Sequence, residues 1–205
     1  MSQPPLRIGV LASGAGTTLQ AVIDACAAGK LPAVVAVVIG NNSGAGAFER
    51  ARRHGIADVH LSAVTHPDAR ALDAAVRDTL RAHCVDLVLL AGYMKKLGPA
   101  TLEAFPGRIV NTHPALLPKH GGKGLYGSRV HAAVLASGAR TTGVSVHVVD
   151  ADYDTGRVLA QREVPVEPGD DVATLTMRVQ AVEREFLVEV LQRIAVGAIR
   201  LESKT

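Results

Sequence analysis

Short runs of apolar residues recur along the chain and alternate with longer segments of mixed polarity. The apolar runs are rich in Val, Ile, Leu and Ala and cover residues 6–12, 33–39, 86–91 and 107–112, with a shorter candidate at 57–61. Runs of this length that are closed by Gly, Asn or Pro predict strands buried in a sheet. The intervening segments predict helices at residues 17–29, 45–54, 68–83, 99–105 and 128–137.

The last third of the chain follows a different pattern. Residues 142–150 and 157–166 predict two further strands, and residues 170–196 predict a long final helix. About six residues join the two strands, too few for a parallel crossover, so these strands should pair antiparallel at one side of the sheet. We therefore predict an α/β fold with one Rossmann-like, doubly wound domain over residues 1–205. Its sheet should be mostly parallel, with an antiparallel pair near the C-terminal part.

The composition narrows the classes of ligand. Aromatic residues make up 3% of the chain and Trp is absent, whereas proteins that read single-stranded nucleic acids stack bases on several aromatic side chains. The formal net charge is +3, and Lys and Arg do not gather into long runs. These features argue against a nucleic acid as partner and favour small anionic molecules.

The cysteines and the N-terminal sequence predict an ordinary cytoplasmic protein. Cys26 and Cys84 lie in helix-like segments without the spacing of a metal site, so we expect two reduced, buried thiols. The first apolar run is too short for a secretory signal, and no stretch of the sequence approaches the length of a membrane-spanning helix. We therefore expect no contact with a membrane.

A glycine-rich turn follows the first predicted strand, with the sequence Ser13-Gly-Ala-Gly-Thr-Thr18. In open α/β sheets such a turn presents free backbone N–H groups at a helix N-terminus, where a phosphate binds well. Thr17 and Thr18 are candidates to add hydroxyl donors or to cap the helix. The turn lacks the Lys of a nucleoside-triphosphate loop, and Leu19 stands where a dinucleotide site needs its third Gly. A single phosphomonoester is therefore the expected ligand.

Two polar residues stand at the end of the strand predicted at residues 107–112. Asn111 and His113 are two positions apart, so their side chains should point to the same face. An amide donor beside an imidazole suits a reaction in which an oxyanion develops at a carbonyl. No Ser or Cys nucleophile accompanies them, which argues against an acyl-enzyme. Asp150, Asp152 and Asp154 follow in a later turn and are equal candidates for an acidic partner.

Three motifs together resemble the folate-dependent formyltransferases. They are the glycine turn with Leu-Gln-Ala after it, the run Asn111-Thr-His-Pro-Ala-Leu-Leu-Pro-Lys, and Thr142-Gly-Val-Ser-Val-His147 followed by Tyr153-Asp-Thr-Gly156. The resemblance extends from about Ile8 to Glu189 and is specific to the branch that formylates glycinamide ribonucleotide in purine biosynthesis. It implies transfer of a formyl group from 10-formyltetrahydrofolate, as co-substrate, to the amine of a phosphorylated sugar derivative. The resemblance implies no metal.

The resemblance also assigns roles to individual residues. It implies Asn111, His113 and Asp154 as catalytic residues, which selects Asp154 among the three acids. The substrate phosphate would bind at Gly16, Thr17 and Thr18, with Gln180 and Glu183 near the substrate amine and phosphate. The folate would contact Met94, Lys95, Lys96, Leu97, Asn111 and Asp150.

Several positions depart from the usual family pattern. Lys95 and Lys96 replace an Arg and an aliphatic residue, and Ala69 with the adjacent Arg70 stands where many members carry an Arg that contacts folate. The loop at residues 119–127 is longer than in many members, and its Lys123 is a candidate contact for a phosphate or for the folate tail.

The chemistry implied is a direct transfer without a covalent intermediate. Asn111 and a protonated His113 would stabilise the tetrahedral oxyanion, and Asp154 would raise the imidazolium fraction of His113. The rivals are a formylfolate hydrolase, a methionyl-tRNA formyltransferase and a non-catalytic module that binds phosphorylated ligands. The chain length leads us to expect neither the extra N-terminal domain of the first nor the extra C-terminal domain of the second. We expect a monomer or a weak homodimer.

Overall fold

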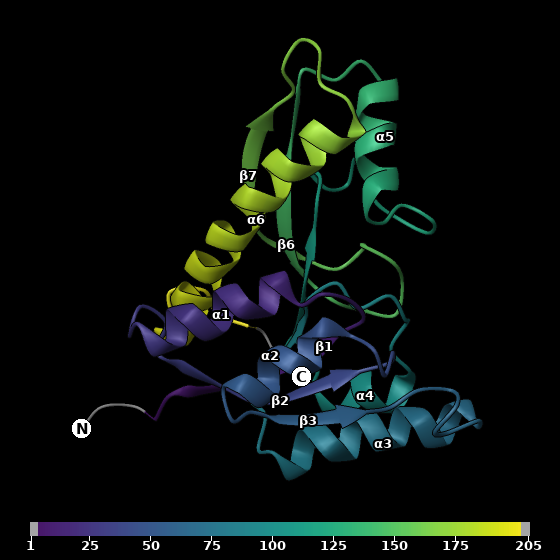
Figure 1. The fold of residues 1–205 in the computed structure, drawn as a ribbon, viewed down its shortest axis with the longest axis vertical. Helices are drawn as coiled ribbons and strands as arrows, with labels where there is room; N and C mark the ends of the chain where they lie inside the picture. Colours follow the sequence, from purple (N-terminus) through teal and green to yellow (C-terminus); the bar gives the residue numbers. More distant parts are fainter. Residues whose placement is uncertain (1–3, 202–205) are drawn as a thin grey trace.

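The computed structural model describes residues 4–201, which form a mixed sheet between two layers of helices (Figure 1). The strands are β1 (Leu6–Ala12), β2 (Ala33–Gly40), β3 (Ala57–His60), β4 (Leu87–Leu90), β5 (Ile109–His113), β6 (Thr141–Val148) and β7 (Val158–Pro165). The helices are α1 (Thr17–Ala27), α2 (Gly46–Arg53), α3 (Ala69–Ala82), α4 (Pro99–Ala104), α5 (Ser128–Ala136) and α6 (Val172–Ala195). All predicted elements are present, with ends shifted by a few residues.

The seven strands have the order β3-β2-β1-β4-β5-β6-β7. Neighbours from β3 to β5 pair in parallel, while β6 pairs antiparallel with both β5 and β7. This confirms the predicted fold class. The expected link of about six residues between the last two strands is wrong, because residues 149–157 separate them. β6 ends at Val148 rather than at residue 150, β7 begins at Val158 rather than at residue 157, and the longer loop carries Asp154.

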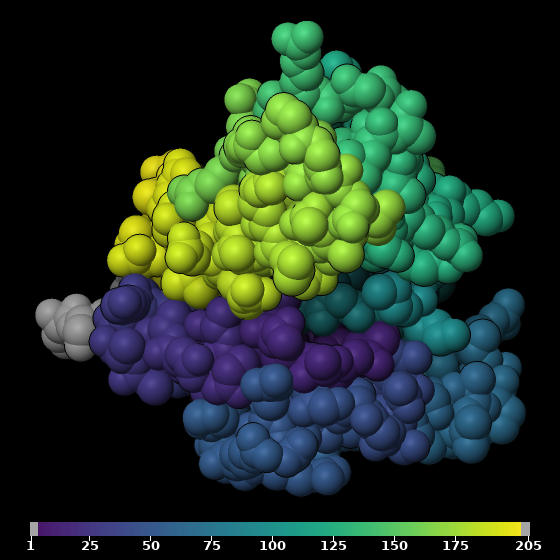
Figure 2. All heavy atoms as spheres, turned by 45° about the horizontal axis from the view of Figure 1, so that its top comes forward, coloured from purple at the N-terminus to yellow at the C-terminus, as the bar shows by residue number. Residues whose placement is uncertain are grey.

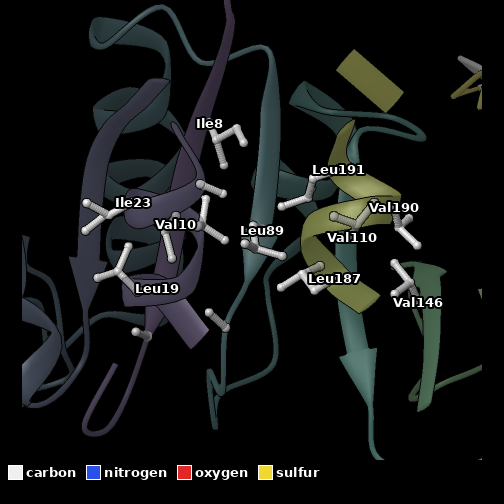
Figure 3. Packing of buried hydrophobic residues seen from close by; sticks show 14 of the residues in the cluster. Ile8, Val10, Leu19, Ile23, Leu89, Val110, Val146, Leu187, Val190 and Leu191 are labelled. Atoms are coloured by element: carbon white, nitrogen blue, oxygen red, sulfur yellow. The ribbon is translucent and has the colours of Figure 1, made fainter. Parts of the chain in front are cut away.

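Apolar side chains fill both faces of the sheet. On one face, Leu19 and Ile23 of α1 belong to the same apolar cluster as Ile8 and Val10 of β1, and Leu187 and Leu191 of α6 lie beside Leu89 of β4 and Val110 of β5 (Figure 3). The other face is covered by α3 and α4, whose apolar residues pack on β2 and β4. Strands covered on both sides have few polar positions, which explains the nearly continuous apolar runs in the sequence.

The longest helix, α6, packs against helices from both the N-terminal and the C-terminal parts of the sheet. It lies against α1 and α5, and Figure 2 shows its yellow-green surface along the purple N-terminal segment. An N-terminal capping box between Asp171 and Thr174 begins the helix. No helix within residues 4–201 has the length and apolar character needed to cross a membrane.

The two cysteines differ from the prediction. Cys26 on α1 is partly buried, but Cys84 is exposed. Cys84 follows the end of α3 in a left-handed backbone conformation with φ 50°. It therefore lies in a turn outside the helix and does not continue the buried face of α3. The expectation of a second buried thiol is therefore wrong.

Strand order determines where a ligand can bind. From β1 the chain moves outward to β2 and β3, and it then returns to place β4 on the other side of β1. Such a reversal opens a crevice at the carboxyl ends of the two central strands. The glycine-rich turn follows β1 and the Met94–Leu97 segment follows β4, so both lie at this crevice.

Candidate active site

The glycine loop, residues 13–16, connects β1 to α1. Gly16 is the N-cap of α1 with φ 73°, and no side chain caps the helix. The suggestion that Thr17 or Thr18 caps it is therefore wrong, because both are already helical residues. The first backbone N–H groups of α1 lie in an accessible turn, where a ligand can accept from them.

Ser13 ties this loop to the neighbouring strands. Its Oγ donates to Asn41 Oδ1 at 2.5 Å and accepts from the backbone N–H of Met94 at 2.8 Å. Its own N–H donates to the carbonyl of Gly92 at 3.2 Å. One serine thus holds the ends of β1, β2 and β4 together and fixes the glycine loop relative to the Met94–Leu97 segment.

The polar cluster consists of Asn111, His113, His147 and Asp154. His113 Nδ1 lies 3.5 Å from Asp154 Oδ2, and His147 Nε2 lies 3.5 Å from Asp154 Oδ1. Asn111 and His113 lie on the same face of β5 as predicted, and the antiparallel pairing with β6 sets His147 opposite Asn111. One carboxylate therefore faces two imidazoles at the end of the sheet.

Hydrogen bonds determine which ring nitrogens carry protons. The carbonyl of Val148 lies 3.0 Å from His147 Nδ1, and because a carbonyl only accepts, Nδ1 carries the proton. His147 Nε2 can then accept from the amide of Asn111 at 3.2 Å. This bond orients the Asn111 side chain with its NH2 group toward β6, and it leaves the second N–H of that amide for a ligand. The sequence pattern did not predict His147 as a site residue, although His147 ends the motif that begins at Thr142.

His113 is held in the same way by the loop at residues 119–127. The carbonyl of His120 lies 2.8 Å from His113 Nε2, so this nitrogen carries a proton. The proton that titrates is therefore the one on Nδ1, which faces Asp154. Within this loop Lys123 is exposed, and its contact with a ligand stays a prediction.

The three acids of the 150–154 turn have different surroundings. Asp154 is 12% exposed, accepts from the backbone N–H of Gly122 at 2.9 Å and has a left-handed φ of 57°. Asp150 accepts instead from Thr155 Oγ1 and from the N–H of Asp152, which is exposed. Only Asp154 faces the imidazoles. A non-glycine residue in this backbone region is uncommon and is often found at functional sites.

Two opposing effects act on the pKa of His113, namely burial of the ring and the charge of Asp154. Burial lowers the pKa of His113 below 6.5, and the neighbouring Asp154 and the His120 carbonyl offset this only in part. The expected effect of Asp154 is confirmed in direction, since the carboxylate raises the pKa of His113, but the net shift is downward because loss of solvation outweighs that attraction. Burial alone would raise the pKa of Asp154, but the hydrogen bond from the Gly122 N–H and the nearby imidazoles of His147 and His113 together lower it below 3.8.

Glu183 on α6 lies between Thr112 of β5 and Thr18 in the first turn of α1. Its Oε1 accepts from Thr112 Oγ1 at 2.8 Å. Burial raises the pKa of Glu183 above 4.5, against the opposing effects of Thr112, Arg184 and the Thr18 hydroxyl. Thr18 and Glu183 are thus neighbours. Gln180 is exposed one turn earlier on the same helix.

A cavity of about 790 Å³ opens beside the segment after β4. Lys95, Lys96 and Leu97 line it together with Ala69, whereas Arg70 and the polar cluster do not. Met94 is 56% exposed at the surface nearby. The cavity and the polar cluster are bridged by Lys96, whose ammonium lies 5.4 Å from the ring centre of Tyr153 in the Asp154 turn.

The polar cluster contains hydrogen-bond donors, acceptors and one carboxylate. Within residues 4–201, His, Cys, Asp and Glu side chains do not gather in sets of three that could hold an ion. Asn111 and the glycine loop offer N–H donors to an anion or oxyanion, and the His113–Asp154 pair can hold and move a proton. The arrangement suits transfer of a carbonyl group between two bound molecules.

Comparison with known proteins places the chain in a family. The formyl transferase family matches residues 6–191. The phosphoribosylglycinamide formyltransferase of Mycobacterium tuberculosis is 41% identical over 201 residues, which cover 98% of this chain and 90% of that protein. The chloroplastic enzyme of that name from Arabidopsis thaliana is 41% identical over 195 residues, or 95% of this chain and 67% of that protein.

A solved structure agrees with the sequence comparison. Glycinamide ribonucleotide transformylase 1 from Symbiobacterium toebii superimposes with a TM-score of 0.91 at 40% identity, covering 99% of this chain and 93% of that chain. The family match and relatives of this similarity show that the chain belongs to the formyl transferase family, in its phosphoribosylglycinamide formyltransferase group.

Proposed function

We propose that the chain transfers the formyl group of 10-formyltetrahydrofolate to the amine of N1-(5-phosphoribosyl)glycinamide, giving the N-formyl product and tetrahydrofolate. The observation that carries this proposal is the meeting of Asn111, His113 and Asp154 at the crevice that also holds the glycine loop. Family membership sets the reaction class, and these positions supply an oxyanion donor, a proton carrier and an anion site.

The two substrates approach from different sides of the crevice. The phosphate binds to the N–H groups at Gly16, Thr17 and Thr18, because an uncapped helix N-terminus attracts an anion. Glu183 and Gln180 lie toward the ribose and amine of the same molecule. The folate contacts Met94, Lys95, Lys96, Leu97 and Asp150, with its acidic tail toward the cavity lined by the two lysines.

The reaction proceeds without a protein nucleophile. The amine nitrogen attacks the formyl carbon, and the carbonyl electron pair moves to oxygen. The free N–H of Asn111 donates to that oxyanion. The C–N10 bond then breaks as the carbonyl re-forms, N10 takes a proton, and the amine nitrogen loses one through Asp154 or water. The titrating proton of the His113 imidazolium lies on Nδ1 and faces Asp154. Its lowered pKa makes it a stronger acid, so the His113–Asp154 pair delivers this proton toward N10 through the carboxylate or water.

A spectroscopic assay tests this function. The protein is mixed with a 10-formylfolate analogue, with phosphoribosylglycinamide, and with both, while absorbance of the folate is followed. A change only with both substrates is the expected result. A change with the folate alone would indicate hydrolysis, and binding of either substrate without turnover would indicate a non-catalytic module.

A further inference from the structure

Helix α2 packs directly against the back of the glycine loop. The backbone N–H of Ala47 donates to the carbonyl of Gly14 at 3.2 Å, and Arg50 Nε donates to the carbonyl of Ala15 at 2.8 Å. These are consecutive carbonyls of the loop. The same helix therefore holds two adjacent peptide groups from one side.

The two bonds determine where the N–H groups of the loop point. In a planar trans peptide the C=O and N–H vectors are opposite. Because the carbonyls of Gly14 and Ala15 face α2, the N–H groups of Ala15 and Gly16 face away from it. They point to the open side of the turn, where α1 begins and where an anion can bind.

Two glycines make this close packing possible. A Cβ on Gly16 would lie 2.7 Å from Ala47 Cα, and a Cβ on Gly46 would lie 3.1 Å from the Ala15 carbonyl oxygen. The loop and α2 are thus in backbone contact, and the orientation of one depends on the other.

Arg50 is the only part of this contact made by a long polar side chain within the described residues. Its Nη1 also donates to Gln20 Oε1 on α1 at 3.1 Å, so the guanidinium links α2, the loop and α1. Arg50 belongs to none of the ion pairs formed within residues 4–201. Its charge therefore adds positive potential behind the loop.

We propose that Arg50 is a positioning residue that sets the glycine loop for the phosphate of the substrate. The inference rests on the proposed function, since it assigns the loop to that phosphate. Arg50 acts through the Ala15 carbonyl and does not touch the ligand. Loss of its hydrogen bond should weaken recognition of the phosphate and leave the formyl-transfer step unchanged.

The test compares Arg50→Gln and Arg50→Lys with the control Arg53→Gln. Arg53 carries the same charge on the same helix but pairs only with Glu49 at the surface. kcat and KM are measured with phosphoribosylglycinamide and with its dephosphorylated form, the glycinamide riboside. For Arg50→Gln we expect kcat/KM to fall about tenfold with the phosphorylated substrate, through KM, which corresponds to loss of one charge-assisted hydrogen bond. We expect kcat/KM for the riboside and KM for formylfolate to stay within twofold of the parent.

Arg50→Lys separates positioning from charge. Lysine retains the charge but cannot hold the Ala15 carbonyl and Gln20 with one rigid group. A Lys variant closer to Arg50→Gln than to the parent supports positioning, and one closer to the parent overturns it. Equal losses for both substrates, or the same loss in Arg53→Gln, would also overturn the inference.

Failure of the proposed function can be distinguished from failure of this inference. If the parent protein transfers no formyl group, the proposed function fails. If the parent does transfer it and the Arg50 variants behave like the control, only this inference fails. Inorganic phosphate as competitive inhibitor gives a second readout that Arg50→Lys should weaken.

Discussion

The glycine loop and the polar cluster lie at the same edge of the sheet, but the chain builds them in different ways. The loop uses backbone N–H groups and two carbonyls fixed by α2, within residues 13–50. The polar cluster uses side chains from β5, β6 and the turn that contains Asp154. The first is a local structure oriented by packing, and the second is assembled from segments that meet only in the folded protein.

This difference predicts how each region responds to change. Backbone donors cannot be removed by substitution of a side chain, so the glycine loop should respond to changes in its backbone geometry more than to changes in side-chain type. The polar cluster depends on specific side chains, so a change of side-chain type should reduce its activity even where the fold is retained.

Substitution of Asn111 or Asp154 in the polar cluster should give the largest loss of activity. For Asn111→Ala and Asp154→Asn we expect kcat to fall by about 10²–10³, because a preorganised oxyanion donor or the proton partner of His113 is lost. Melting temperature and circular dichroism should remain close to those of the parent. Asp152→Asn is the matched control, since its carboxylate is exposed. Near-normal turnover in Asn111→Ala or Asp154→Asn would contradict the catalytic role proposed for that residue.

A geometric change in the loop should act mainly on stability. Gly16→Ala forces a side chain into a left-handed position and against Ala47, at a cost of about 2 kcal/mol. For a domain of this size the melting temperature should fall by about 4–8 °C. Gly14→Ala is the control, because a Cβ there meets no atom within 4 Å. Equal melting temperatures in the two variants would contradict the described contact between the loop and α2.

The charge balance of His113 can be measured directly. An NMR titration should place the pKa of His113 below 6.5, because burial opposes its charged form. Asp154→Asn should lower it further, since the carboxylate raises this pKa. Asp152→Asn should leave it unchanged. A pKa of His113 above 6.5 in the parent would contradict the conclusion that burial outweighs the attraction of Asp154.

Substitution of Glu183 should have the smallest effect, which is a change in how the stability of the fold depends on pH. Its folded pKa is raised by burial, so the folded state binds the proton more tightly than the unfolded state. Stability from this group is then present below the unfolded pKa of about 4.5 and is lost as the pH rises through the folded value. Glu183→Gln should therefore melt at a higher temperature than the parent near pH 7, and this advantage should vanish near pH 4. Activity should fall at the same time, which distinguishes a functional acid from a structural one.

The fold could be predicted from the sequence because its signals are local. Continuous apolar runs such as residues 6–12 and 33–39 require strands covered on both faces, and the alternation with helices then requires a parallel sheet. The position of the glycine loop after β1 followed from the same pattern. The helix cap did not, because Gly16 at the N-cap leaves Thr17 and Thr18 inside the helix.

The candidate site was predictable only in part. Asn111 and His113 share a strand, so their common face follows from strand geometry. Asp154 could not be chosen over Asp150 or Asp152 from the pattern, and only resemblance to a family selected it. His147 gave no separate signal, because its role depends on the register between β5 and β6.

The sequence by itself determined the order of strands and helices, the glycine turn and the spacing of Asn111 and His113, since each depends on residues that are neighbours in the chain. The tertiary structure alone decided which acid faces His113, that His147 orients Asn111, and that Arg50 holds the Ala15 carbonyl. It also decided the direction in which the pKa of His113 shifts, because loss of solvation depends on everything packed around the ring. Contacts between distant segments and the burial that they cause are properties of the folded chain, and no local pattern encodes them.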